Sequence, residues 1–315
     1  MAATRTFKIP FQPKAIHGIY GVNYYFQKKD AVSQRLQFEA TVEYCGQYMS
    51  EYSLYHISKK EYVVNRNESN EYLYDIAQKC ANIIFPISVL LDMNGHPVLI
   101  RTDDIVRRWS EKRTELDRYY KGDIAEYYLN KVEEAVNDPV KMTQLISNDL
   151  FFSQLFAFQY NNTANMTEFE NDIMLIPFSV PLQFSSMREI DMESYSNSEC
   201  DTIHIIHKGN TKKPYKYGDF YSSSDMNASQ CNAMLSAKYC IHYNLEKESL
   251  DVEAIEGDFV ISKEEGDLNS IKIEAYRLDE KALEYGFDEE FEKSEREQKR
   301  IDNSLMNKLK RYFKT

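Results

Sequence analysis

Residues 102–160 form a long block with helical periodicity in a chain that otherwise has the pattern of short strands. The block contains Trp109, the only tryptophan, and ends in the apolar segment 150–156 (LFFSQLF). Strands before the block and strands after it must therefore bury their apolar faces against the same helices. We expect an α+β fold, with one curved antiparallel sheet (β meander, central helical block, β meander), helices packed on one face and a C-terminal amphipathic helix.

Alternation of apolar and polar side chains identifies the clearest strands. Residues 36–44 and residues 235–243 place apolar side chains at every second position, which predicts one buried and one wet face. Between two further apolar runs, Asn94-Gly95 tolerates the positive φ angles of a two-residue hairpin turn. Pro97 cannot donate to a sheet ladder, so the second strand of that hairpin is expected at a sheet edge.

Three helices are expected within the helical block. The first follows directly on the hairpin. A variant of the capping box, Asp123 with Glu126, predicts the start of the second. Asp138 followed by Pro139 predicts the start of the third, because this pair supplies an N-cap and then proline at its favoured first position. The third helix is expected to continue into the apolar segment 150–156.

The C-terminal end differs in composition from the rest of the chain. Acidic residues dominate from 279 to 297, and basic residues dominate from 299 to 315. We expect a single α+β domain over residues 1–278, with a candidate internal boundary in the acidic stretch 189–200. Residues 279–315 are then a charged linker and an amphipathic helix.

Charge and cysteine content limit the partners and the compartment. The formal net charge of -12 argues against general nucleic-acid binding, because neutralising phosphates requires a basic face. Residues 1–13 lack the apolar run of a secretory signal, and no apolar stretch approaches the ~20 residues of a membrane span. Five cysteines without a close CxxC pair fit free thiols in a reducing compartment. We expect a cytoplasmic protein without a membrane span.

Motifs that would indicate catalysis, a cofactor or a metal are missing from the sequence. There is no G-x-S-x-G elbow, no G-x-G-x-x-G fingerprint and no Walker-type loop. His204 and His207 are three residues apart, so on a strand they point to opposite faces and cannot share one ion. Cys240 and His242 do share a face, but their spacing matches no established ligand pattern. No enzyme activity, cofactor or metal is therefore expected.

The leading hypothesis is a non-catalytic protein-binding or assembly protein. Tyrosine is abundant, and its apolar ring with a polar tip suits contact surfaces. The expected partner is another protein, with a second copy of this chain among the candidates. Contacts are expected from the cation-aromatic loop and from the apolar stripe of the last helix, that is from Lys213, Tyr215, Tyr217, Leu305, Leu309, Tyr312 and Phe313.

Two other functions remain open. In the first, the protein carries an apolar small molecule between the sheet and the third helix, held by Phe151, Phe152 and Phe156. In the second, it is a hydrolase whose acids and His242 come together from distant segments. The carrier hypothesis requires unfilled apolar space inside the fold, whereas the hydrolase requires convergent polar groups.

Overall fold

A computed structural model describes most of the 315-residue chain, namely residues 9, 12–28, 34–64, 71–156, 166–175, 180–220, 232–263 and 266–278. The chain divides into two compact units, Met1–Arg277 and Leu278–Thr315. Every helix and strand described below belongs to the first unit. The predicted C-terminal helix lies outside the described residues.

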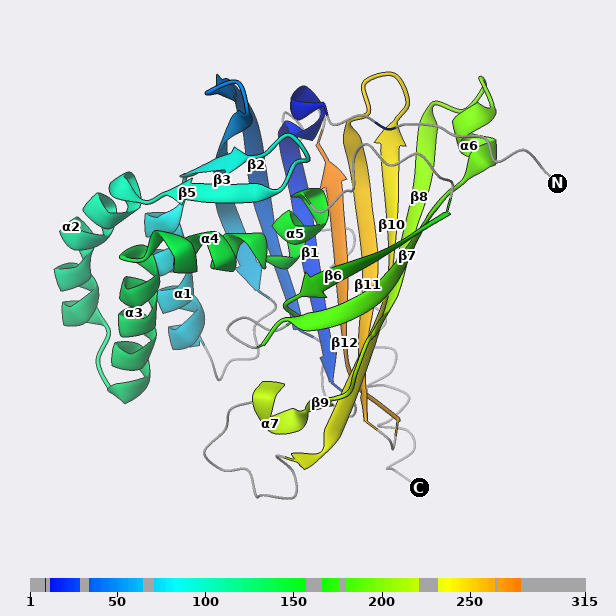
Figure 1. The fold of residues 1–315 in the computed structure, drawn as a ribbon. Coiled ribbons are helices and arrows are strands. Elements are labelled where there is room, and N and C mark those ends of the chain that lie inside the picture. The colour runs from blue at the N-terminus through cyan, green and yellow to red at the C-terminus, as the bar shows by residue number, and fades with distance from the viewer. Residues whose placement is uncertain are drawn as a thin grey trace, which may run out of the picture. The chain divides into compact units, whose positions relative to one another are not determined.

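One open antiparallel sheet forms the framework (Figure 1). Its strand order is β5-β4-β3-β2-β1-β12-β11-β10-β8-β7-β6, and β9 pairs with β10 beside this path. The predicted α+β class and antiparallel sheet are thus confirmed. The strands are β1 (Gly18–Lys28), β2 (Gln34–Tyr48), β3 (Tyr52–Val64), β4 (Ile87–Leu91), β5 (Pro97–Arg101), β6 (Met166–Ile173), β7 (Leu182–Ile190), β8 (Thr202–Thr211), β9 (Tyr215–Lys216), β10 (Met234–Glu246), β11 (Val252–Lys263) and β12 (Gly266–Arg277).

Pairing between β1 and β12 joins the two meanders into one sheet. These strands are antiparallel, with Tyr20 opposite Arg277 and Lys28 opposite Asn269. The N-terminal meander therefore continues directly into the C-terminal one, and the helices between them in sequence cover both. The stretch 189–200 contains the end of β7 and the short helix α6 (Met192–Ser196).

The helices fall into two groups beside the sheet. Helices α1, α2 and α3 contact one another near the β3 to β5 end, while α5 contacts β11 and β12 (Figure 1). Helix α4 contacts edge strand β5, where the hydroxyl of Thr143 accepts from the Ile100 amide at 3.1 Å. The helices not yet given are η1 (Pro13–Ile16), α1 (Glu71–Ile84), α2 (Asp103–Tyr119), α3 (Asp123–Val136), α4 (Pro139–Ser147), α5 (Leu150–Phe156) and α7 (Tyr217–Phe220).

Three local predictions are wrong. The third helix of the block is two helices, because Asp149 accepts from the Phe152 amide at 3.2 Å and so starts α5 as a new helix. Asp123 is the first residue of α3 and not its cap, since Gly122 occupies the N-cap position. The polar composition of residues 161–171 predicts a loop, but residues 166–171 belong to β6, whose side chains alternate in exposure although few of them are aliphatic.

A buried ion pair attaches α5 to the sheet. Lys59 on β3 places its Nζ 2.6 Å from Oδ2 of Asp149, and the two side chains are 7% and 23% exposed. The Phe151 amide donates to the hydroxyl of Tyr24 on β1 at 2.9 Å. Nζ of Lys59 also lies 4.6 Å from the ring centre of Phe152, a cation–π contact. These contacts fix the start of α5 against β1 and β3.

Candidate functional site

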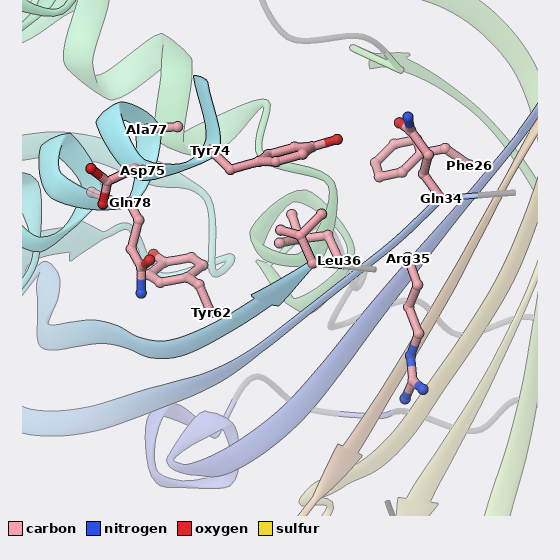
Figure 2. A pocket seen from close by; sticks show the side chains of 11 residues that line it. Phe26, Gln34, Arg35, Leu36, Tyr62, Tyr74, Asp75, Ala77 and Gln78 are labelled. Atoms are coloured by element: carbon pink, nitrogen blue, oxygen red, sulfur yellow. The ribbon is translucent and has the colours of Figure 1, made fainter. Parts of the chain in front are cut away.

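A pocket of about 380 Å³ lies between α1 and the ends of β1, β2 and β3 (Figure 2). This volume falls within the range of ~300–1,000 Å³ that is usual for small-molecule sites. Most of the lining side chains are aromatic or aliphatic. The lining comprises Phe26, Gln34, Arg35, Leu36, Tyr62, Val64, Tyr74, Asp75, Ala77, Gln78 and Ala81.

Helix α1 leaves space because the face that it turns toward the pocket carries small side chains. Tyr74, Ala77, Gln78 and Ala81 follow the spacing i, i+3, i+4, i+7 and so share one helical face. Ala77 and Ala81, one turn apart, contribute only a methyl group each. At these two positions α1 therefore lacks side chains that would fill the gap to the opposing strands.

The strands supply the opposite wall of the pocket. Leu36 on β2 lies between Tyr24 on β1 and Val64 on β3 in the sheet register. Figure 2 shows the side chain of Leu36 pointing into the pocket, with Tyr74 extending from α1 above it. Alternation along β2 sends the neighbouring Arg35 the other way, as the same view shows. Apolar strand residues thus face the methyl groups of α1.

Charged groups near the pocket already interact within the fold. Nη2 of Arg35 lies 2.8 Å from Oδ1 of Asn23, on the side away from the pocket. The carboxylate of Asp75 accepts from the hydroxyl of Tyr120. Burial raises the pKa of the Tyr62 phenol, which keeps the phenol neutral well above pH 7. The lining is suited to an uncharged, largely apolar molecule.

The phenylalanines predicted to hold a ligand belong to the filled core. Phe151, Phe152 and Phe156 are at most 1% exposed, and none of them lines the pocket. The ring centres of Phe151 and Phe152 are 5.2 Å apart, and those of Phe152 and Phe156 are 5.9 Å apart. They fill their space with one another, so the pocket lies elsewhere than the sequence predicted.

The predicted partner-binding loop makes contacts within its own chain. The hydroxyl of Tyr215 accepts from the Gln183 amide at 2.8 Å. Nζ of Lys263 lies 4.3 Å from the ring centre of Tyr217, and Lys213 is exposed. Nζ of Lys213 lies 5.7 Å from the ring centre of Tyr215, so both tyrosines already contact cations of their own chain. The other predicted partner residues lie outside the described part of the chain, namely Leu305, Leu309, Tyr312 and Phe313.

Cys240 and His242 come together on one face of β10, as the sequence predicted. Sγ of Cys240 lies 3.5 Å from Nε2 of His242. Burial is the main cause that raises the pKa of the Cys240 thiol, with Asp258 adding to the effect and Lys208 opposing it. A thiol with a raised pKa is protonated near neutral pH, whereas catalysis by cysteine needs the thiolate. This pair therefore lacks the electrostatics of an activated nucleophile.

His207 on β8 is a buried histidine that the folded protein keeps neutral. Burial lowers its pKa to about 3, and the neighbouring positive charge of Arg188 contributes. Its ring packs against Phe169 and Tyr243 at centre distances of 5.3 and 4.8 Å. His204 lies on the opposite, exposed face, as the strand alternation predicted.

This environment predicts acid sensitivity. Below pH 6.5 the unfolded chain binds a proton that folded His207 does not accept until about pH 3. Neutral His207 therefore carries no proton-linked cost above pH 6.5. As the pH falls below that value, proton binding by the unfolded chain lowers the free energy of unfolding. Between pH 7.5 and pH 5.0 the free energy of unfolding should fall by about 2 kcal/mol because of His207. Urea titrations should show this loss absent from His207→Phe and retained in the exposed control His242→Phe. Equal pH slopes for His207→Phe and the unaltered protein would contradict the assignment.

Comparisons with known proteins give no family for this chain. No protein-family model matches it, and no curated protein sequence matches it. One solved structure, a protein of unknown function from the DUF3598 family of Nostoc punctiforme, shares 8% identity over 85% of this chain and 100% of its own. The TM-score is 0.13, a value too low to support an argument about fold or function. Among the described helices, none is both long and apolar enough to cross a membrane.

Proposed function

We propose that the protein is a non-catalytic binding protein that holds one uncharged, largely apolar small molecule in the pocket between α1 and strands β1 to β3. The observation that carries this proposal is the unfilled apolar space opposite Ala77 and Ala81. Apolar walls with a few polar groups that set orientation are the usual composition of a small-molecule site.

The polar groups of the lining define the ligand further. Gln34 and Gln78 each offer an amide that can donate and accept, and Tyr74 offers a phenol. A ligand that placed a charge among Leu36, Val64 and the aromatic rings would lose hydration without gaining an opposite charge. The favoured ligand is therefore an apolar body with one or two carbonyl or hydroxyl groups.

A protein partner is the second candidate function. Apolar side chains are exposed around the β4–β5 hairpin, with Met93 at 69%, Val98 at 48% and Leu99 at 42% exposure. Exposed apolar residues that lie close together on a surface are a feature of interaction sites. The pocket is the stronger basis, because it combines shape with a defined chemistry.

Titration with Nile red, an uncharged apolar dye whose fluorescence rises in apolar surroundings, tests the small-molecule proposal. The full-length protein, washed free of bound molecules by organic extraction and refolded, should bind one equivalent of dye. Molecules extracted from the native protein should displace the dye. A protein that is folded, as judged by circular dichroism, but gives no saturable fluorescence would contradict the proposal.

A further inference from the structure

A thiol, an imidazole and a carboxylate gather on the β2–β3 ladder, away from the pocket. These groups belong to Cys45 on β2, His56 on β3 and Glu43 on β2, respectively. One donor atom from each lies within 4.8 Å of the other two. Among the residues that the structure describes, these form the one group of three potential metal ligands with donor atoms this close together.

The sheet register brings these donors together. Glu43 lies directly opposite His56, so their side chains leave the same face of the sheet. The register shifts between Tyr44 and Gly46, which makes Cys45 the additional residue of a β-bulge. Bulges of this kind redirect a side chain, and they occur often beside functional sites. Sγ of Cys45 consequently lies 3.6 Å from the carbonyl oxygen of Glu43.

The opposite face of the ladder fixes the strands that carry the donors. Tyr55, beside His56, is fully buried, and its hydroxyl donates to the carbonyl of Pro13 at 2.6 Å. The rings of Tyr44 and Tyr55 pack with centres 5.5 Å apart. Backbone positions under the three donors are thus held by core packing, while the donors themselves are exposed.

We propose that Glu43, Cys45 and His56 bind a zinc ion, with water in the fourth coordination position. Thiolate, imidazole and carboxylate are the three side-chain ligands that zinc takes in proteins, and three of them leave one position of a tetrahedron open. The sulfur ligand selects against magnesium and calcium, which prefer oxygen.

The spacing requires little movement to bind the ion. Zinc bonds of about 2.0–2.3 Å place tetrahedral donors within about 4 Å of one another. Small rotations of the three exposed side chains therefore convert the cluster into a coordinating set. On binding, the Cys45 thiol releases its proton to solvent and the sulfur donates an electron pair to the ion.

Cobalt substitution tests the site in the full-length protein after treatment with a chelator. One equivalent of Co²⁺ should give the absorption of a sulfur-to-cobalt bond, and Zn²⁺ should displace it. Cys45→Ser should abolish that absorption and weaken Zn²⁺ binding by roughly 100-fold or more, since even the loss of a group that only orients a ligand costs 10–100-fold. His56→Gln should weaken Zn²⁺ binding in the same direction.

Cys240→Ser is the matched control, because Cys240 also lies next to a histidine but belongs, among the described residues, to no group of three donors with this spacing. It should keep both the absorption and the Zn²⁺ affinity of the unaltered protein. Unchanged Zn²⁺ binding in Cys45→Ser, or loss of the cobalt absorption in Cys240→Ser, would overturn the assignment. Equal melting temperatures of the variants would establish that a loss of binding does not come from unfolding.

Discussion

Ala77→Phe should lower the affinity for Nile red by about 100-fold or more, which corresponds to about 2.7 kcal/mol. Ala77 lies on the face of α1 that lines the pocket. A phenyl ring at this position occupies the space in which the ligand would lie. Because the ring enters unfilled space, the change should leave folding intact, unlike overpacking of a filled core. Fluorescence titration measures the dissociation constant directly.

Lys79→Phe is the control for this prediction. Lys79 is exposed on the same helix and is not part of the pocket lining, so the substitution adds the same ring outside the site. It should bind the dye as the unaltered protein does. An equal loss of affinity in both variants would point to dye binding on the surface. Full binding by Ala77→Phe would show that the dye does not occupy this pocket.

Lys59→Met should lower the free energy of unfolding by about 3 kcal/mol, at the low end of the range for breaking a buried ion pair. Methionine keeps most of the side-chain volume, so the loss comes from the charge and not from a cavity. The carboxylate of Asp149 would remain with less than a quarter of its side chain exposed and without its lysine. Urea unfolding followed by circular dichroism measures the difference.

Lys112→Ala is the matched control for the ion pair. Nζ of Lys112 lies 2.8 Å from Glu115, a separation similar to that of the buried pair, but the two side chains are 57% and 70% exposed. Its removal should leave the unfolding free energy almost unchanged, because exposed ion pairs contribute little to stability. In addition, the double variant Lys59→Met/Asp149→Asn should lose less unfolding free energy than the two single variants lose together. Additive losses would show that the two residues act independently.

Local features of the fold could be predicted from the sequence. The alternation at residues 36–44 and 235–243 identified parts of β2 and β10, and Asn94-Gly95 identified the β4–β5 hairpin. Asp138 caps α4 as predicted, accepting from the amides of Val140 and Lys141. Each of these signals depends on residues within a few positions of one another.

The order of the elements predicts one sheet, but the strand pairing that joins the two meanders could not be predicted in this way. It depends on β1 pairing with β12, which places Tyr20 opposite Arg277 at the far end of the domain. Such a pairing leaves no periodic signal in either strand, because each strand would show the same alternation beside any other neighbour. The break between α4 and α5 was missed although its signal is local, since Asp149 caps α5 by accepting from an amide three residues away.

The pocket was missed because apolar character does not distinguish filled space from open space. Phe151, Phe152 and Phe156 had the composition of a ligand site, yet their rings fill the core. Ala77 and Ala81 recur at helical spacing with Ile76 and Cys80, which predicts only an apolar stripe on a helix. Their significance depends on the size of the strand residues opposite them, which only the tertiary structure reveals.

Native mass spectrometry of protein purified gently from its own cells tests whether the α1 pocket holds a small molecule. The spectrum should show the chain with one added organic mass, distinct from any metal ion, which disappears on denaturation and is missing from Ala77→Phe but present in Lys79→Phe. A bare chain, or a chain that carries only a second polypeptide, would contradict the claim that the α1 pocket holds a small molecule.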